Sequence, residues 1–229
     1  MRVAIMQPYF FPYIGYWQLV SAVDYFVIFD DVNYINKGYI NRNSILLDGL
    51  KHQITLELIK ASQNKLINEI DVGSNYSKLL KTIQSAYRKA PLFESAYPVV
   101  EGILAQKEKN LSKFLGDGIE MLSKYIGNDT RFIYSSDIGV DSSLKSQERV
   151  ISIAKELHAT HYINAIGGQE LYSRERFKKE GIKLNFLKSM MGEYKQFKND
   201  FIPSLSIIDV MMFNEVKCIQ GMLDMYELT

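Results

Sequence analysis

Two acidic residues, Asp30 and Asp31, directly follow an apolar run and are the first side chains in the sequence that could do chemistry. A carboxylate in this position can act as a general base or bind a metal–phosphate group. It can equally cap the end of a strand that faces water. His52 and Lys37 carry the other reactive groups near this segment. We therefore take Asp31, His52 and Lys37 as the candidate catalytic residues, with Asp30 as a binding residue.

A cationic segment, "NYINKGYINRN", follows the acidic pair. Arg42 can bind a phosphate through two donors, and Lys37 supplies a point charge beside it. Asn43 adds an amide that can bind oxygen atoms. These residue types predict a site for an anionic ligand rich in oxygen, although a solvated loop would have a similar composition.

An aromatic loop, "MQPYFFPYIGYW", precedes the acidic pair in the chain. Gly15 would let a ligand approach the start of a helix, where free N–H groups favour phosphate. Its aromatic rings either stack on a base or sugar ring or cover the hydrophobic core. The candidate binding residues of this loop are Gln7, Tyr9, Tyr13, Gly15, Tyr16 and Trp17.

Five short apolar runs that alternate with helical patterns would position these groups as parallel strands. They are residues 2–6, 25–29, 131–136, 161–168 and 182–187. In open α/β sheets, ligands bind beyond the carboxyl ends of the strands, near the point where the strand order reverses. This rule places the aromatic loop, the acidic pair, Ser135 and the Gly167-Gly168 pair on one rim. It also requires the strand that begins at Arg2 to be internal.

The remaining segments complete the predicted fold. Asp48-Gly49 between two β-prone runs is typical of a hairpin turn. Apolar residues at helical spacing predict an inserted helical layer at about residues 75–127, and the methionine-rich segment 201–226 predicts two helices. The fold class is α/β: a Rossmann-like, mainly parallel sheet with a β-hairpin and the helical layer, in a single domain over residues 1–229.

Composition limits the partners of the chain. Lys and Arg total 27 against 26 Asp and Glu, so no overall field favours nucleic acid or an acidic membrane. The sequence contains no secretory leader and no apolar run long enough for membrane insertion, so we expect a cytoplasmic protein. The single cysteine, Cys218, is expected to be a buried thiol in a helix. No metal-binding spacing is present, so no metal site is predicted.

Several motifs together resemble the WbqC-like protein family. They are "MQPYFFPYIGYW", "FVIFDDVNYINKGYINRN", "YRKAPLF", "THYINAIGGQELY" and "FIPSLSIID", and they cover nearly the whole chain. The resemblance implies a role in the biosynthesis of bacterial surface polysaccharides, such as the O-antigen of lipopolysaccharide. A more distant similarity to HIGH-type nucleotidyltransferases rests on the first strand, its proline-containing loop, Gly15 and the acidic end of the second strand.

These features favour a transferase that acts on a nucleotide-linked amino sugar. In this hypothesis the aromatic loop stacks the base, Lys37 and Arg42 hold the diphosphate, and Asp31 or His52 takes a proton from the attacking amine. The second reactant would be an acyl or aminoacyl donor, free or on a carrier protein; no other cofactor is indicated. Nucleotidyl transfer and a non-catalytic role in sugar-nucleotide binding or assembly remain as alternatives. The sequence leaves oligomer formation open.

Overall fold

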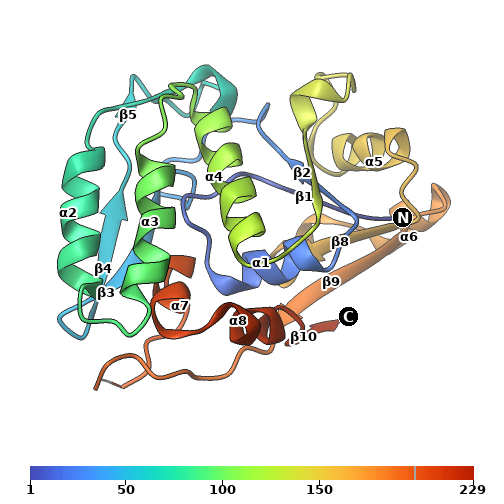
Figure 1. The fold of residues 1–229 in the computed structure, drawn as a ribbon. Coiled ribbons are helices and arrows are strands. Elements are labelled where there is room, and N and C mark those ends of the chain that lie inside the picture. Colours follow the sequence, from blue (N-terminus) through green and yellow to red (C-terminus); the bar gives the residue numbers. More distant parts are fainter. Residues whose placement is uncertain (199) are drawn as a thin grey trace.

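The computed structural model, which describes residues 1–198 and 200–229, is built on a six-stranded sheet with the order β10-β9-β8-β1-β2-β7 (Figure 1). Five of these strands are parallel, and β10 pairs antiparallel with β9 at one edge. Their bounds are β1 Arg2–Met6, β2 Tyr25–Ile28, β7 Arg131–Tyr134, β8 His161–Ala165, β9 Lys183–Ser189 and β10 Tyr226–Leu228. The predicted mixed α/β fold with a mainly parallel sheet is confirmed.

Strand β1 is internal, as expected, because it pairs with β2 on one side and with β8 on the other. Val3, Ala4 and Ile5 are all buried, which explains why this strand is continuously apolar. From β1 the chain adds β2 and β7 on one side, and β8 and β9 later extend the sheet on the other side. The strand order therefore reverses between β1 and β8, and this is the topological switch point.

The hairpin predicted at Asp48-Gly49 is also present. Strands β3 (Arg42–Leu47) and β4 (Leu50–Thr55) pair antiparallel, and both turn residues have positive φ angles, of 50° and 75°. This conformation suits the sequence Asp-Gly, since glycine and aspartate tolerate the left-handed region better than most residues. Two very short strands, β5 (Leu58–Ile59) and β6 (Asp71–Val72), follow the hairpin.

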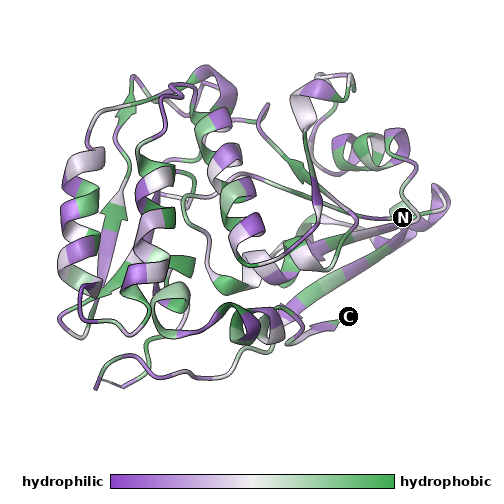
Figure 2. Cartoon of the chain, viewed as in Figure 1, coloured by the Kyte–Doolittle hydropathy of each residue, from purple (hydrophilic) through white to green (hydrophobic). Residues whose placement is uncertain are grey.

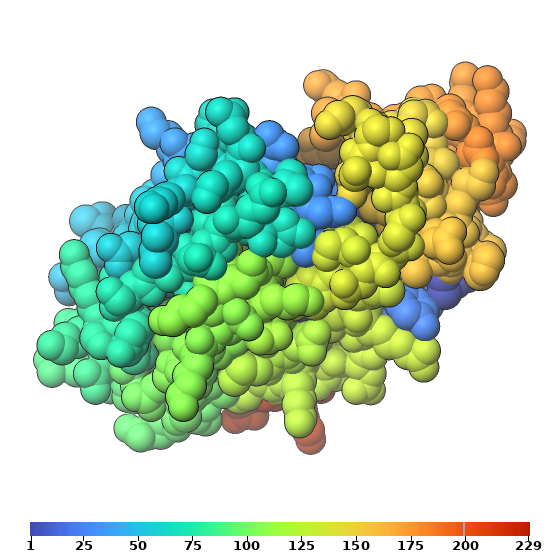
Figure 3. Space-filling view, turned by 90° about the horizontal axis from the view of Figure 1, so that it is seen from above, coloured from blue at the N-terminus to red at the C-terminus, as the bar shows by residue number. Residues whose placement is uncertain are grey.

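Three long helices lie between the hairpin and β7, in the predicted helical region. They are α2 Tyr76–Tyr87, α3 Phe93–Leu104 and α4 Leu111–Tyr125. Figure 2 shows hydrophobic and hydrophilic residues alternating along them, as expected for helices with one face on a core. Viewed from above, residues of the hairpin and helical region gather on one side and those from β7 to β9 on the other, with N-terminal residues visible between them (Figure 3).

Helices cover the sheet and form two hydrophobic clusters. The larger cluster includes α1 (Ile14–Ser21), and the smaller one includes residues of α5 (Ser146–Glu156) and α6 (Arg174–Lys179). Tyr16 and Trp17 belong to the larger cluster and expose only 1% and 0% of their surface. The prediction that these two rings stack on a ligand is therefore wrong; their large apolar area is used to cover the sheet.

The C-terminal segment forms the two predicted helices, α7 (Ile207–Phe213) and α8 (Val216–Leu223). Cys218 lies on α8 but is exposed, which corrects the expectation of a buried thiol. Strand β10 after α8 was not predicted from the sequence. Within the described residues, no helix combines the length and the apolar character needed to cross a membrane.

Candidate functional site

A cleft of about 530 Å³ opens at the switch point, beyond the carboxyl ends of β1 and β8. Its walls come from the loop after β1, the start of α1, the segment before β3 and the turn after β8. Its polar, aromatic and glycine lining residues are Gln7, Tyr9, Tyr13, Gly15, Phe29, Tyr39, Asn164, Gly167, Gly168, Tyr172 and Ser189. Gln7, Tyr9, Tyr13, Gly15, Gly167 and Gly168 were predicted to lie together, and the structure brings all six to this cleft.

The loop after β1 is held by a small number of buried polar contacts. Asn43 donates from Nδ2 to the carbonyls of Phe10 and Phe11, at 3.1 and 2.7 Å. Phe11 has a φ of 44°, and its carbonyl also accepts from the Ser206 hydroxyl at 2.9 Å. The Tyr16 hydroxyl donates to the carbonyl of Gln7 at 3.1 Å. Asn43, predicted as a ligand contact, is 3% exposed and fixes the loop that carries Tyr9 and Tyr13.

Three tyrosines form the aromatic wall of the cleft. The rings of Tyr9 and Tyr39 lie 5.5 Å apart between centroids, and Tyr13 lies close to both. Burial, and then the neighbouring Tyr13 and Tyr39 hydroxyls, raise the pKa of Tyr9 to about 12. Burial also raises the pKa of Tyr13. Tyr9 and Tyr13 are thus neutral hydrogen-bonding groups at physiological pH, and they are poorly suited to act as bases there.

Two glycines in the cleft lining leave room for neighbouring side chains. A β-carbon at Gly15 would lie 2.6 Å from a ring carbon of Tyr13, so glycine permits this tyrosine to fold over the start of α1. A β-carbon at Gly168 would lie 2.3 Å from Nδ2 of Asn164. The Asn164 Oδ1 atom accepts from the N–H of Ala165 at 2.9 Å, which orients the amide. Both glycines therefore set the position of a neighbouring polar side chain.

The polar groups of the cleft are neutral. Gln7, Asn164 and Ser189 contribute side-chain donors and acceptors. The start of α1 and the 3-10 helix at Ile166–Leu171 bring the backbone to the cleft at Gly15, Gly167 and Gly168. Among the described residues that line the cleft, none is a lysine, arginine, histidine, aspartate or glutamate.

Asp30 lies outside the cleft in a closed network of hydrogen bonds. It is 1% exposed, and its carboxylate accepts from the backbone and hydroxyl of Ser136, at 3.1 and 2.9 Å. Further donors are Ser112, Ser135 and Asn68. Ser135 itself is buried between the two aspartates. Asp30 and Ser135 therefore join the end of β2 to the segment after β7 and to α4, and neither reaches the cleft.

Asp31 forms an ion pair with Arg149 of α5, and the side chains of both residues are largely buried. The guanidinium of Arg149 also lies 5.7 Å from the ring centroid of Phe29, and Phe29 lines the cleft. Asp31 is thus behind the cleft wall. Its carboxylate is engaged by Arg149 and by the Ser135 hydroxyl, so it is not free to contact a ligand in the cleft.

The two predicted cations do not line the cleft. Arg42 donates from Nε to the carbonyl of Gly38 at 3.0 Å and from Nη2 to the carbonyl of Lys37. Lys37 is exposed and has a φ of 61°, so this turn needs support. The structure therefore indicates that Arg42 stabilises the turn at residues 37–38. The predicted grouping of Asp31, Lys37 and Arg42 with the aromatic loop around one cleft is wrong.

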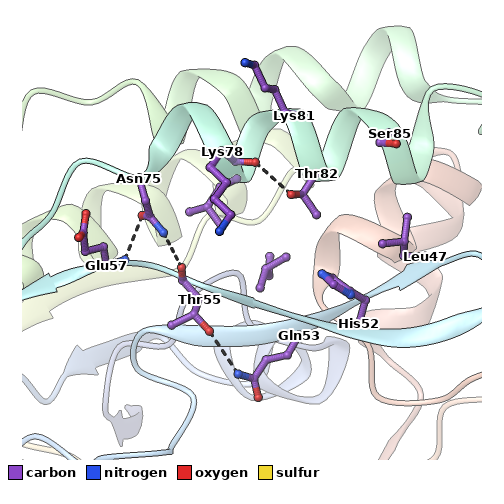
Figure 4. Close-up of a pocket in the computed structure, with 12 residues that line it drawn as sticks. Leu47, His52, Gln53, Thr55, Glu57, Asn75, Lys78, Lys81, Thr82 and Ser85 are labelled. Atoms are coloured by element: carbon purple, nitrogen blue, oxygen red, sulfur yellow. Dashed lines mark hydrogen bonds between the residues drawn. The ribbon is translucent and has the colours of Figure 1, made fainter.

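His52 was predicted to reach the rim, but it lies on β4 in a different groove, beside α2 (Figure 4). The hairpin diverges from the parallel sheet, so the rule that places strand ends on one rim does not apply to it. Conversely, sequence reasoning missed Tyr39, Asn164 and Tyr172 as cleft residues. Asn164 could have been noticed as a polar residue at the end of an apolar strand, directly before the glycine pair.

The fold and the cleft together define an α/β protein with an open cleft at the switch point of a mainly parallel sheet. The model of the WbqC-like protein family matches residues 7–220, and the chain belongs to this family. It is also similar to the uncharacterized protein Rv1507c of Mycobacterium tuberculosis, with 27% identity over 218 residues that make up 93% of each chain. No solved structure matches significantly, so the similarity to HIGH-type nucleotidyltransferases has no structural support.

Proposed function

We propose that this WbqC-like protein binds a nucleotide-linked amino sugar in the switch-point cleft and transfers an acyl or aminoacyl group to its amine. The product would enter bacterial surface polysaccharide. One observation carries the proposal: the cleft combines a tyrosine wall with neutral amide side chains, and two helices begin at its lining. Sugar rings and bases pack on aromatic rings, and amides bind hydroxyl groups.

The diphosphate would lie at the start of α1 and at Gly167-Gly168, where backbone N–H groups and helix ends favour anions. This arrangement replaces the earlier hypothesis that Lys37 and Arg42 hold it. A neutral cleft can accept an anion in this way because the backbone donors need no counter-charge of their own.

In the transfer step, the sugar nitrogen attacks the carbonyl carbon of the donor. A C–N bond forms, the bond from that carbon to the donor's leaving group breaks, and the leaving group takes the proton lost by the amine. Among the described residues that line the cleft, none carries a carboxylate, an imidazole or an amine that could act as a base. Catalysis would therefore depend on holding the two reactants in line, with the amide of Asn164 or Gln7 beside the carbonyl oxygen.

The same lack of a base favours a second candidate, a non-catalytic sugar-nucleotide-binding protein. Such a protein needs the tyrosine wall and the backbone donors but no reacting geometry. Nucleotidyl transfer has less support, because a cleft without cationic side chains offers little stabilisation to a transferring phosphate.

A thermal-shift screen over UDP-, TDP-, GDP- and CMP-sugars and ATP tests binding. A ligand at 100 times its Kd stabilises the native state by roughly 2.7 kcal/mol, which raises the melting temperature measurably. Tyr39→Ala should abolish the shift, and Lys37→Ala, outside the cleft, should leave it unchanged. If no sugar nucleotide shifts the wild type, both candidates fail.

A mass-spectrometric assay then separates the two candidates. Two forms of the sugar nucleotide that binds are compared: one carries an amine on the sugar, and the matched one carries a hydroxyl at the same sugar carbon. Each is incubated with an acyl thioester or an aminoacyl ester. Acylation of the amino form alone supports the transferase. Binding of both forms without a product supports the non-catalytic protein.

A further inference from the structure

A second groove, of about 900 Å³, lies between β4 and α2 and shares no lining residue with the cleft. Figure 4 shows α2 forming one wall and the β-strand the other. Its lining residues are Leu47, His52, Gln53, Ile54, Thr55, Glu57, Asn75, Lys78, Leu79, Lys81, Thr82 and Ser85. None of these residues has a part in the proposed transfer reaction.

The groove runs along the edge of β4. Four consecutive residues, His52 to Thr55, line it, although successive side chains of a strand point to opposite faces. In Figure 4, His52 lies on the side of α2 and Gln53 on the opposite side. A hollow that contacts both must therefore follow the backbone edge between the two faces.

The hairpin register shows which backbone groups face this edge. Leu47 and Leu50 flank the two-residue turn and form a hydrogen-bonded pair, so the pairs alternate from there. Leu46 pairs with Lys51, and Ser44 with Gln53, as non-hydrogen-bonded pairs. Two contacts support this assignment on the β3 side, since Leu46 N–H donates to the Tyr87 hydroxyl and the Ser44 carbonyl accepts from Ser206 N–H, both at 2.8 Å.

By the same register, the N–H and C=O groups of Lys51 and Gln53 point away from β3. Within the described residues they make no hydrogen bond outside the hairpin, whereas the next outward carbonyl, that of Thr55, accepts from Asn75 Nδ2 at 2.9 Å. Lys51, His52 and Gln53 are all exposed. Strand β4 thus presents an open hydrogen-bonding edge, and the outward edge of β3 is occupied.

Charge indicates what could pair with this edge. Lys78 and Lys81 of α2 line the groove, and among the described residues neither forms an ion pair. The acidic side chain of the lining, Glu57, already accepts from the N–H of Ser74 at 2.9 Å. A second copy of this chain would bring the same lysines to the interface and be repelled, whereas an acidic segment would be attracted.

We propose that β4 binds an extended, acidic segment of a partner protein by β-strand addition. The segment pairs its backbone with the outward groups of Lys51 and Gln53 and places carboxylates near Lys78 and Lys81. Alternate side chains of the segment pack on Ile54 and Leu79 at the base of the groove. Main-chain hydrogen bonds supply affinity in this mode of recognition, and the side chains supply specificity.

Fluorescence anisotropy with a labelled peptide of alternating threonine and glutamate tests the proposal, with alternating threonine and lysine as the control peptide. The acidic peptide should bind at least about tenfold more tightly, and more weakly as salt rises. Equal binding of both peptides, or no binding, overturns the proposal.

Gln53→Pro provides the structural test. It removes an outward N–H without removing a hydrogen bond of the hairpin, and should weaken binding about tenfold or more. Gln53→Val keeps the N–H and should bind as the wild type does. If circular dichroism shows that Gln53→Pro does not fold, the double variant Lys78→Glu, Lys81→Glu tests the proposal instead. It must bind the acidic peptide more weakly than the wild type does, and the basic peptide more tightly. A concentration-dependent dimer in sedimentation velocity, lost in Gln53→Pro, would show that a second copy occupies this edge and would overturn the proposal.

Discussion

The switch-point cleft and the Asp30 network lie close together on the same sheet, yet they differ in what their polar groups do. Asp30 and Ser135 have their hydrogen bonds satisfied inside the protein, and the ion pair of Asp31 is buried beside them. The cleft is lined by neutral amides, hydroxyls and glycines around an open volume. Charged residues in a sequence attract attention as reactive groups, but here the charges stabilise the fold and the neutral groups are the ones free to bind.

The largest expected effect is on the Asp30 network. Asp30→Ala would remove the acceptor of the buried Ser112 hydroxyl and of the Ser136 backbone and hydroxyl, while Ser135 keeps Asp31. It should lower the free energy of unfolding by about 3 kcal/mol. Urea denaturation measures this. Asp137→Ala, which removes an exposed carboxylate from the same segment, is the control and should change stability little.

An Asp30→Ala variant that folds with normal stability but loses ligand binding or turnover would contradict a structural role for Asp30. Such a result would make Asp30 part of the reactive site.

Gly168→Ala should weaken ligand binding in the cleft, whereas Asp30→Ala should lower stability. The new methyl group would displace the amide of Asn164. The free energy of binding of the sugar nucleotide should therefore become less favourable by about 1–2 kcal/mol, the size of a lost hydrogen bond. Isothermal titration calorimetry measures it. Gly192→Ala is the control, because a β-carbon there meets no atom within 4 Å and Gly192 does not line the cleft. Equal losses in the two variants would show that Asn164 does not contact the ligand.

Arg42→Ala sharpens the boundary of the site. Because its guanidinium holds the carbonyls of Lys37 and Gly38, we expect a loss of about 1 kcal/mol in stability and an unchanged Kd for the ligand. Thermal unfolding and calorimetry on the same preparation check both. A weaker Kd with unchanged stability would return Arg42 to the binding site.

The smallest effect concerns Glu180, a half-buried counterpart of the buried carboxylates. Hydrogen bonds from Lys155 and then Arg176 lower the pKa of Glu180 from 4.5 to about 2. A folded-state pKa below the unfolded one means that the contribution to stability is present above pH 4.5 and disappears as the pH falls towards 2. The difference in melting temperature between wild type and Glu180→Gln should therefore shrink over that range. A difference that stays constant would show that the contacts do not depend on the charge of Glu180.

The sequence by itself determined the five parallel strands, the hairpin and the position of the cleft. Continuous apolar runs such as residues 3–5 identified buried parallel strands, because a strand covered on both faces has no polar side. Asp48-Gly49 identified the hairpin, because few other pairs accept two positive φ angles. The β/α alternation then located the cleft through topology, and the predictions for Tyr9, Tyr13 and the Gly167-Gly168 pair followed from that rule.

Only the tertiary structure decided which polar and aromatic side chains remain free. Tyr16 and Trp17 resemble Tyr9 and Tyr13 in the sequence, but the helix that begins at Ile14 turns them into the core. From the sequence alone Asp30 could be a reactive carboxylate. In the structure it accepts hydrogen bonds from Ser112 of α4 and from Ser136, both far along the chain. Tyr39 enters the cleft because its segment returns to the loop after β1, where its carbonyl accepts from Phe10 N–H at 3.0 Å. Availability for binding depends on long-range partners, and local sequence patterns contain no information about them.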